Sequence, residues 1–450
     1  MAVLFFLQGE KKMKIKPLSF GEKLSFGAGD VANCITFGFT AAYLSYYYTD
    51  IIGISVAAVG FILGVARILE AFANIGTGIA IDRTDTRWGK TKPFLYTTTI
   101  PLMLFFFLML MVPDLSMTGM TIFAFVTYLT FCLLYAVNNT AYGTLLSMMT
   151  GDVHQRRSIN NFKLIGIGVG NVIATACTLP LAAFFGGGRK GYLFAGLLYA
   201  LVSVVLLMDC SLVCKERIQV HSGKTKVSGE IKNALKSRSW IALCALALFV
   251  TCAQMLRTTS IVYYAKYVLD NENLATVILA TSPLSMLVIS PFVGHILDKA
   301  GNRKAMMAGC VGMLVSIGGM LVSGTSVPGQ VVFNFIFGIF SCICTGPMYA
   351  SCSDTMDEVE YLTGERPQGI MTSIMMCTCK LGIAFAPIIA SAVLKWGGYV
   401  AGQVQSQAAV RAINLNMFWF PAVFILLGML SAAFFDLDQK HEEILRKLGR

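Results

Sequence analysis

The sequence predicts an all-α integral membrane protein in which twelve membrane-spanning helices form two six-helix bundles. Apolar residues make up 56% of its 450 residues and charged residues only 13%, whereas soluble domains average roughly 45–50% apolar and about 25% charged. The apolar residues gather into stretches of about 20 residues or more, the length that a helix needs to cross a bilayer. These observations exclude a soluble multidomain chain and predict a single membrane unit.

Short loops separate the predicted spans, except for one longer hydrophilic connection at residues 214–238. This connection divides the chain into an N-terminal bundle over residues 25–213 and a C-terminal bundle over residues 239–435. A hydrophilic segment over residues 1–24 precedes the bundles, and a mixed-charge tail over residues 436–450 follows them. The spans are predicted at residues 25–48, 54–80, 93–113, 119–148, 159–186, 191–213, 239–267, 273–297, 304–324, 328–350, 370–395 and 412–435.

The basic residues are distributed unevenly between the two sets of loops. Twenty-six of the 35 lie in the N-terminal segment, in alternate loops or in the tail. The other loops hold only Arg189, Lys190, Lys266, Lys395 and Arg411. Because basic loops stay in the cytoplasm, this asymmetry predicts a multi-pass protein of the cytoplasmic (inner) membrane with both termini cytoplasmic. It also accounts for the net charge of +11 without a nucleic-acid partner. The expected partners are membrane lipid and a small polar solute, and we expect a monomer.

A short motif recurs after the second span of each half. It reads Gly78-x-x-x-Asp82-Arg83 in the first half and Gly294-x-x-x-Asp298-Lys299 in the second, and a basic cluster follows each copy. The aspartate can accept hydrogen bonds from the N-terminus of an adjacent helix, and the glycine lets helices approach. An ordinary basic loop is the alternative, but repetition at matching positions favours two related bundles. The gating candidates are Asp82, Arg83, Asp298, Lys299, Asp357 and Arg366.

Ionisable side chains within the spans are the main functional signal, because a charge in hydrocarbon costs at least about 2.5 kcal/mol on insertion scales. Arg67, Glu70 and Asn74 lie at i, i+3 and i+7 of the second span and share one face. Glu70 is roughly 18 Å from the cytoplasmic end of that helix. It is predicted to bind a cation or carry a proton, with Asn74 adding an oxygen. A structural ion pair between Arg67 and Glu70 is the alternative.

Spans one and four also carry polar side chains. Asp30 and Asn33 share a face near the cytoplasmic end of span one, where Asp30 could bind the coupling ion or the substrate, or could instead serve a gate or helix packing. A polar cluster in span four consists of Tyr135, Asn138, Asn139 and Tyr142. Amide and phenol groups on one face suit the recognition of hydroxyl groups. Interhelical hydrogen bonds are the alternative.

Three further cations lie within the predicted spans. Lys380 is roughly 15 Å into span eleven, too deep to reach water easily, and is expected to meet a carboxylate or the substrate. Arg257 is placed similarly in span seven, with Gln254 one turn before it. Lys163 is close enough to the cytoplasmic end to extend its ammonium into water, so both a functional and an interfacial role stay open.

The sequence carries no motif of a soluble enzyme, and an enzyme is not predicted. It has no Walker loop, so ATP is not the predicted energy source. No cofactor or metal site is expected beyond a coupling ion, H⁺ or Na⁺. The N-terminal Met1–Leu7 stretch is apolar but too short for a signal-peptide core, and Met13 is expected to be the true start of translation.

Short stretches along essentially the whole chain resemble the glycoside–pentoside–hexuronide:cation symporters, a branch of the major-facilitator superfamily that includes the melibiose carrier. They are Phe26-Gly27-Ala28-Gly29-Asp30, Tyr46-Tyr47-Tyr48-Thr49-Asp50, Ala66-Arg67-Ile68-Leu69-Glu70-Ala71, Arg87-Trp88-Gly89-Lys90, Ala141-Tyr142-Gly143-Thr144-Leu145, Tyr263-Tyr264, Tyr267-Val268-Leu269 and Asp354-x-x-Asp357. The resemblance implies the major-facilitator fold, with two pseudo-symmetric six-helix bundles around a cavity. It also implies alternating access and sugar transport coupled to Na⁺, Li⁺ or H⁺.

The resemblance implies roles for single residues as well. Glu70 matches an acidic residue of the cation site, and Lys380 matches a lysine near both sites. Tyr135 falls at a cavity tyrosine, and Lys163 lies near a basic position of span five. Where the melibiose carrier has three further carboxylates, this chain has Cys34, Asn74 and Asn139. A single glutamate flanked by cations suits proton coupling better than Na⁺ coupling, and the loss of the sugar-binding aspartate argues against simple galactosides.

The predicted function is therefore secondary transport of a sugar, glycoside or hexuronide, coupled to H⁺ rather than Na⁺. A cavity with more cations than anions favours an acidic sugar. The coupling candidates are Glu70, Asn74, Lys380 and Asp30, and the substrate candidates are Tyr135, Asn139, Tyr142, Arg67, Arg257, Asn33 and Lys163. An uncoupled facilitator, a carrier of another amphipathic solute and a transporter-like sensor are the alternatives.

Overall fold

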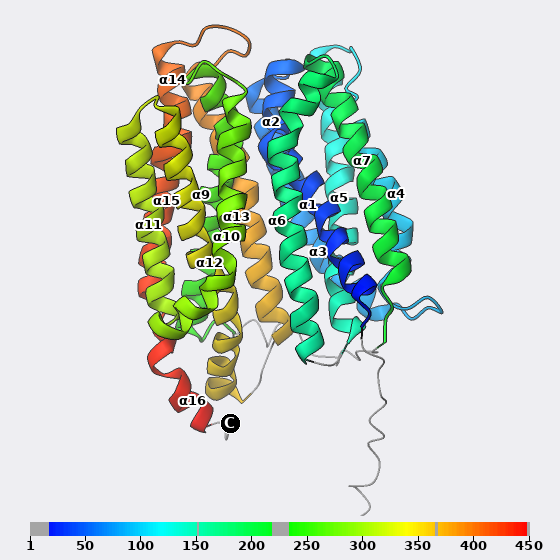
Figure 1. Cartoon of the computed structure of the whole chain (residues 1–450), viewed down its shortest axis with the longest axis vertical. Coiled ribbons are helices and arrows are strands. Elements are labelled where there is room, and N and C mark those ends of the chain that lie inside the picture. Colours follow the sequence, from blue (N-terminus) through cyan, green and yellow to red (C-terminus); the bar gives the residue numbers. More distant parts are fainter. Residues whose placement is uncertain (1–17, 151–152, 218–233, 365–367, 448–450) are drawn as a thin grey trace, which may run out of the picture.

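The computed structural model describes residues 18–150, 153–217, 234–364 and 368–447, and these residues are almost entirely helical. Figure 1 shows two groups of helices side by side. The first group consists of α1 (Phe20–Ala42), α2 (Leu44–Tyr46), the π-helix η1 (Tyr47–Ile51), α3 (Val56–Arg83), α4 (Lys92–Leu108), α5 (Met117–Met149), α6 (Val153–Phe184) and α7 (Gly188–Val213). The second consists of α9 (Arg238–Tyr267), α10 (Leu274–Ala300), α11 (Asn302–Ser323), α12 (Val327–Thr363), α13 (Gln368–Trp396), α14 (Gln407–Asn414), the π-helix η2 (Leu415–Trp419) and α15 (Phe420–Ala433), followed by the short η3 (Leu437–Gln439) and α16 (His441–Lys447).

The predicted spans coincide with helices, and all-α membrane architecture is confirmed. Within the described residues, nine helical segments are long and apolar enough to cross a membrane, and two shorter apolar helices cover Lys92–Leu108 and Leu274–Ser290. The remaining predicted span is α1, which carries polar and small residues. The largest difference is α12, which runs to Thr363 rather than ending near residue 350. Its last turns carry acidic residues, so they do not appear as part of an apolar span in the sequence. The helix ends at Gly364, which adopts the left-handed conformation (φ 74°).

Close helix packing within the first half depends on glycine. A Cβ on Gly166 of α6 would lie 2.1 Å from the carbonyl oxygen of Gly27 on α1, and one on Gly170 would lie 2.6 Å from that of Val31. Helices α1 and α6 therefore touch along their backbones, which small residues permit. Gly168, on another face of α6, instead meets Leu287 of α10 in the second half.

The same kind of cap holds one helix N-terminus in each half. In the first half, a carboxylate oxygen of Glu216 accepts hydrogen bonds from the amides of Thr91 and Lys92, at 2.9 and 3.2 Å, where α4 begins. In the second half, Asp438 accepts from the amide of Arg303 at 2.8 Å, where α11 begins. Both carboxylates come from segments that follow the last long helix of their own half. The predicted acceptors were Asp82 and Asp298, whose side chains lie outside the described residues.

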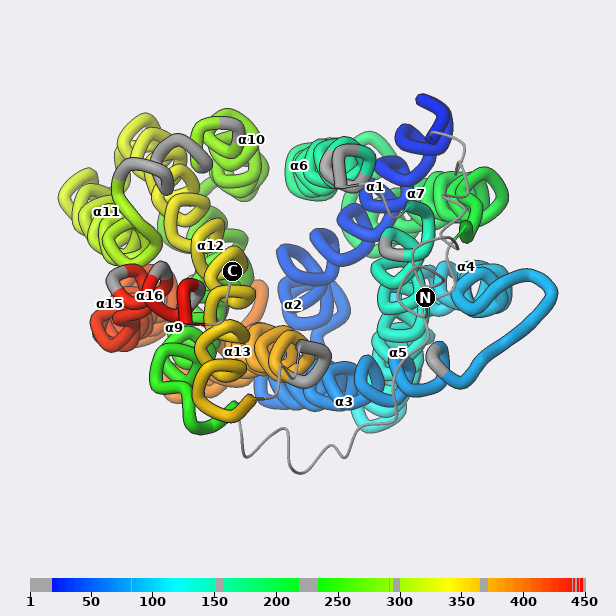
Figure 2. Tube along the Cα trace, turned by 90° about the horizontal axis from the view of Figure 1, so that it is seen from below, coloured from blue at the N-terminus to red at the C-terminus, as the bar shows by residue number. Residues whose placement is uncertain are grey.

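The two halves meet mainly through two helix pairs, α3 with α13 and α6 with α10, and also where α1 and α2 contact α9. We call the end where α1 begins and α16 lies the terminal end, and the opposite end, at α14, the distal end (Figure 1). Figure 2 views the molecule from the terminal end and shows α2 between the two halves. On the distal half of α3, Cβ atoms on Gly60 and Gly64 would lie within 2.4 Å of Ser391 and Ile388 of α13.

The contact between α3 and α13 is lost toward the terminal end. Gly78 lies 18 residues after Gly60, which is about five helical turns, so both point the same way. A Cβ on Gly78 nevertheless finds no described heavy atom within 4 Å. The two halves are therefore closed on each other at the distal end and separated along this face at the terminal end.

Candidate functional site

A three-membered ion cluster lies in the middle of the interface between the halves. Arg67 and Glu70 lie one turn apart on α3, and Nη1 of Arg67 is 2.7 Å from Oε2 of Glu70. Lys380 of α13, from the other half, places its Nζ 3.1 Å from Oε1 of Glu70. Arg67 and Glu70 are only 4% and 3% exposed. Lys380 therefore meets a carboxylate, as expected for a lysine this deep, and the cluster joins the two halves.

Arg67 is held on every side by its own half. Its Nη2 donates to Oγ1 of Thr40 at 2.8 Å, and its guanidinium lies over the ring of Phe37 at 4.8 Å from the centroid. Asn74, predicted to add an oxygen to this site, turns elsewhere. Its amide nitrogen donates to the carbonyl of Glu70 at 2.6 Å, and its Oδ1 accepts from Thr140 of α5 at 2.9 Å. The cluster thus holds one carboxylate between two cations.

Asp30 forms a second buried site, within the first half. The hydroxyl of Tyr142 on α5 donates to Oδ2 of Asp30 at 2.6 Å, and the Tyr142 ring stacks on Phe26 with centroids 4.5 Å apart. Asp30 and Tyr142 therefore fasten α1 to α5. Asn33, one turn beyond Asp30, is 2% exposed, and both atoms of its amide lack a hydrogen-bond partner among the described residues.

The polar cluster of α5 divides into two groups. Asn138 donates to Thr98 and Thr99 of α4 at 3.0 and 3.1 Å, so it forms the interhelical bonds that were the alternative reading. Tyr135 is 7% exposed, and its ring stacks on that of Phe37 with the ring centroids 6.2 Å apart. Asn139 is half-buried and makes no hydrogen bond with the described residues. The predicted substrate roles of Tyr135 and Asn139 stay predictions.

A cavity of about 430 Å³ lies between the halves. Its walls include Phe37 and Gly38 of α1, Asn171 of α6 and Ile383 of α13, and the second half supplies most of its polar side chains. Those polar groups are Thr251, Gln254, Arg257, Thr258, Ser282, Ser290, Asn334, Ser341 and Tyr349. Of the seven predicted substrate residues, only Arg257 lines this cavity. Lys163 is half-buried on α6 and has no ion pair with the described residues.

Arg257 is buried without a carboxylate partner among the described residues. It is 2% exposed, its Nη2 donates to Oδ1 of Asn334 at 2.9 Å, and its guanidinium lies 3.9 Å above the centroid of the Phe337 ring. Its Nε and Nη1 have no hydrogen-bond partner there. Asn334 is fixed for this contact, because its Nδ2 donates to the carbonyl of Ile278 at 2.6 Å and to Thr281 at 2.7 Å. Arg257 is therefore a buried cation with two donors that no described residue uses.

A polar latch closes the distal end. Asp50 of η1, in the first half, accepts a hydrogen bond from Tyr399 at 2.6 Å, another from Tyr267, and an ion pair from Lys266 at 3.1 Å. All three donors belong to the second half. Further hydrogen bonds cross the same interface. Tyr46 donates to Glu272 at 2.8 Å, and the Tyr263 hydroxyl lies 2.9 Å from that of Ser45 and 2.9 Å from that of Thr49.

The predicted gating residues have different outcomes. Arg83 is exposed on the last turn of α3. Asp357 lies within α12 and pairs with Nε2 of His441 on α16 at 3.1 Å, so a histidine that looks isolated in the sequence has a partner in the fold. Only the backbone of Asp82, Asp298 and Lys299 is described, and Arg366 lies outside the described residues. Their gating role stays a prediction.

Asn334 and the latch residues were missed as functional candidates. Asn334 is a lone amide in an apolar span, a weak signal that also fits a helix-packing contact. Asp50 and its tyrosines were recognised as motifs, but their partners lie more than 200 residues away in sequence. Hydrogen bonds between Asp50 and residues 266, 267 and 399 can be seen only in the folded chain.

The chain is similar to known transporters in its sequence and in its fold. A family model described as MFS/sugar transport protein matches residues 25–439. The chain is 30% identical over 445 residues to "Isoprimeverose transporter" of Lactiplantibacillus pentosus, covering 95% of this chain and 91% of that protein. It is also 30% identical over 444 residues to "Glucuronide carrier protein homolog" of Escherichia coli (strain K12), covering 95% of each. The solved structure of nucleoside transporter NupG matches its fold with a TM-score of 0.67 at 14% identity, over 92% of this chain and 99% of that one.

Proposed function

Because the chain belongs to the MFS/sugar transport protein family, it is a multi-pass membrane transporter of sugars and not an enzyme, and we propose that its substrate is an acidic sugar carried together with protons. The observation that carries this proposal is Arg257, a buried cation that lines the cavity between the halves and has no carboxylate partner among the described residues. A substrate carboxylate would supply the missing charge.

The charge and the unused donors of Arg257 support recognition of an anion. Its Nε and Nη1 lie on either side of Nη2, so each could donate one hydrogen bond to an anionic group in addition to the bond that Nη2 makes with Asn334. Asn334 and Phe337 hold the group in place from the other sides. Gln254, Thr258 and Asn171 offer neutral donors and acceptors on the cavity wall for sugar hydroxyls. A similar protein named as a glucuronide carrier homolog is consistent with this substrate class.

The Arg67–Glu70–Lys380 cluster supports proton coupling. Na⁺ prefers several oxygen ligands, whereas Glu70 is already occupied by two cations and the Asn74 oxygen is used by Thr140. No group of three or more acidic, histidine or cysteine side chains suited to a metal ion is found in the described part of the chain. A proton arriving at Glu70 would neutralise it and free Lys380. Since Lys380 belongs to the other half, protonation would loosen one contact between the halves.

The arrangement of the halves corresponds to one step of alternating access. With the basic loops in the cytoplasm, the terminal end is cytoplasmic and the distal end faces outward. The latch at Asp50 then closes the outward side, and the separation near Gly78 lies on the cytoplasmic side. In the opposite state the latch would open and the terminal ends of α3 and α13 would approach.

Uptake into proteoliposomes tests the proposal. The purified protein is reconstituted and offered labelled glucuronides, neutral glycosides and pentosides, with an imposed pH gradient, an imposed Na⁺ gradient or neither. We expect accumulation of the glucuronide that follows the pH gradient and is indifferent to Na⁺. Accumulation of neutral glycosides alone would contradict the acidic substrate. Equilibration without accumulation under either gradient would instead identify an uncoupled carrier.

A further inference from the structure

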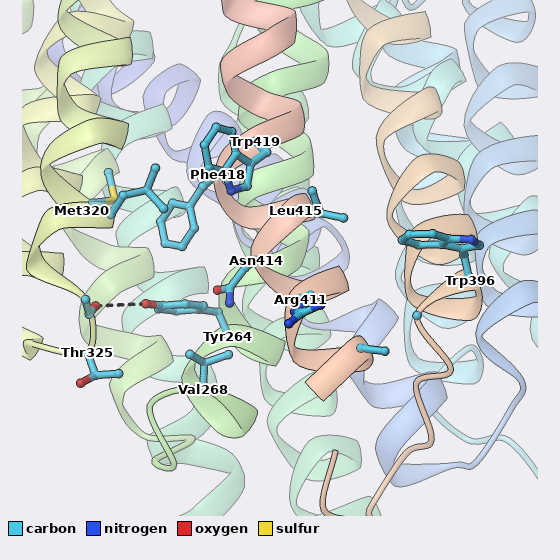
Figure 3. Close-up of a pocket in the computed structure, with 14 residues that line it drawn as sticks. Tyr264, Val268, Met320, Thr325, Trp396, Arg411, Asn414, Leu415, Phe418 and Trp419 are labelled. Atoms are coloured by element: carbon cyan, nitrogen blue, oxygen red, sulfur yellow. Dashed lines mark hydrogen bonds between the residues drawn. The ribbon is translucent and has the colours of Figure 1, made fainter. Parts of the chain in front are cut away.

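A second cavity lies on the outer surface of the second half, away from the interface between the halves. Its volume is about 650 Å³, and its walls come from α9, α11, the end of α13 and the α14–η2 segment (Figure 3). The wall residues are Tyr264, Val268, Met320, Leu321, Gly324, Thr325, Trp396, Gly397, Ala408, Arg411, Asn414, Leu415, Phe418 and Trp419. We call this cavity the lateral groove. It shares no wall residue with the cavity that contains Arg257.

The lateral groove has a polar end and an apolar end. Arg411 lies four residues after the start of the Gln407–Ala433 apolar segment, which is about 6 Å along the helix and close to the membrane boundary. Trp419 lies eight residues further, about 12 Å deeper. Trp396, at the end of α13, is 81% exposed beside the polar end, where tryptophan rings commonly sit at headgroup level. The groove therefore runs from the interfacial region into the hydrocarbon region.

Arg411 gives the polar end a free positive charge. Its side chain is exposed and forms no hydrogen bond or ion pair with the described residues. Asn414, one turn later, is half-buried and also makes no such bond. Figure 3 shows both side chains on one stretch of helix, between Tyr264 and Trp396. The π-helix η2 begins directly after Asn414, and single π turns inside α-helices are frequent at functional sites.

We propose that the lateral groove binds one anionic glycerophospholipid, of the phosphatidylglycerol type, with its phosphate on Arg411 and an acyl chain along Phe418 and Trp419. The phosphodiester supplies one negative charge for the one free guanidinium, and guanidinium groups bind phosphate oxygens with paired hydrogen bonds. The glycerol headgroup brings hydroxyls within the reach of Asn414 and Thr325. The apolar residues below them match a hydrocarbon chain.

The composition of the groove selects among headgroups. None of its wall residues is acidic, so the ammonium of phosphatidylethanolamine would find no carboxylate there. Lys395, on the last turn of α13 and next to Trp396, adds a second positive charge near the rim. A lipid with a net negative charge is therefore favoured over a zwitterionic lipid with the same chains.

Native mass spectrometry of the full-length protein tests this proposal. The protein is exchanged from nanodiscs of equal phosphatidylglycerol, phosphatidylethanolamine and phosphatidylcholine content into mild detergent, and the retained phospholipid is identified. We expect one phosphatidylglycerol per chain. Arg411→Gln should lower its retention about tenfold, the size of one charge-assisted hydrogen-bonded contact. The matched control is Lys190→Gln, which removes an exposed charge at the distal end of the other half and should leave retention unchanged.

A second variant separates lipid binding from folding. Ala408 lines the groove and is exposed, so Ala408→Trp fills it while keeping Arg411. It should abolish retention in protein that remains monodisperse. Equal retention of the three lipids, or equal loss in Arg411→Gln and Lys190→Gln, would overturn the proposal and leave only annular lipid. Retention of phosphatidylglycerol by Ala408→Trp at the wild-type level would overturn the assignment to this groove.

Discussion

The two halves of the transporter cap their helices in the same way, but their buried arginines differ in whether a carboxylate lies beside them. Each half caps a helix N-terminus with a carboxylate that follows its last long helix, Glu216 in the first and Asp438 in the second. Arg67 of the first half is neutralised by Glu70 and enclosed by Thr40 and Phe37. Arg257 of the second half has only neutral neighbours and two free donors. The helix caps are thus repeated in the two halves, whereas the surroundings of the buried arginines differ.

The largest expected effect follows removal of the carboxylate that joins the halves. Glu70→Gln leaves Arg67 and Lys380 buried without their partner, and breaking such a pair costs about 3–5 kcal/mol. We expect accumulation of labelled substrate under a pH gradient to be abolished, together with a clear fall in thermal stability. Glu70→Asp keeps the charge and is the control. Gradient-driven accumulation by Glu70→Gln at the wild-type level would exclude Glu70 as the coupling residue.

The comparison between the arginines is sharpened by giving both the same change. Arg67→Gln should destabilise the protein by about 3–5 kcal/mol, because it leaves the buried Glu70 carboxylate with only Lys380 to balance its charge. Arg257→Gln should lower the free energy of unfolding much less, because it leaves no buried carboxylate without its partner. It should lower uptake of an acidic sugar about 10- to 100-fold, as expected for a lost charged hydrogen bond of about 1.5–3 kcal/mol.

Arg257→Lys is the control for this pair, because it keeps the charge and loses the planar set of guanidinium donors. It should retain part of the uptake that Arg257→Gln loses. Stability measurements and uptake measurements on the same preparations separate the two roles. Equal destabilisation by Arg67→Gln and Arg257→Gln would show that the buried arginines are equivalent after all.

A smaller effect is expected at the distal latch. Asp50→Asn removes the charge that Lys266, Tyr267 and Tyr399 share, worth about 1–3 kcal/mol for a partly buried group. Hydrogen exchange should speed up about 10-fold or more in peptides that cover Tyr46–Ile51 and Tyr263–Tyr267. Asp114→Asn is the matched control, because Asp114 pairs with Arg189 within the first half and is 90% exposed. Unchanged exchange in Asp50→Asn would remove the latch from the transport cycle.

The caps give a still smaller effect that should be the same in both halves. Gly89 and Gly301 have φ angles of 106° and 79°, and a Cβ on either would lie within 3 Å of the capping carboxylate. Each alanine substitution should cost about 1–2 kcal/mol, from strain at positive φ and displacement of the cap. Gly53→Ala is the control, because Gly53 has φ 86° but no described atom near its Cβ. If Gly89→Ala and Gly301→Ala lowered the stability only as much as Gly53→Ala does, the capping carboxylates would have moved aside without loss of the cap.

Acidification should remove the cap of the first half. Burial raises the pKa of Glu216, but hydrogen bonds from Thr91 and from the amides of Lys90 and Lys92 outweigh it and hold that pKa below its usual value of 4.5. The contribution of about 1 kcal/mol is therefore present above pH 4.5 and is lost as the pH falls through the lowered pKa. The difference in stability between wild type and Glu216→Gln should shrink over that acidic range. A pH-independent difference would contradict the cap.

The contacts of single residues show how far the sequence could predict the site. The depth of Lys380 and its lack of an escape to water predicted that it meets a carboxylate or the substrate, and in the structure it meets Glu70. The shared face of Arg67, Glu70 and Asn74 follows from helical spacing, but spacing could not show that Asn74 would bind Thr140. Hydropathy placed the spans and yet ended α12 too early, because its last turns are charged and packed against the C-terminal segment.

The sequence by itself determined the all-helical membrane architecture, the two-half organisation and the identity of the buried charges, because hydropathy, loop charge and helical spacing are local properties. Only the tertiary structure decided which charges are paired. Glu70 and Lys380 are separated by 310 residues, and Arg257 lacks a carboxylate only because no acidic side chain among the described residues folds against it. The closed distal end, the cavity at Arg257 and the lateral groove are likewise relations between helices that are distant in the chain.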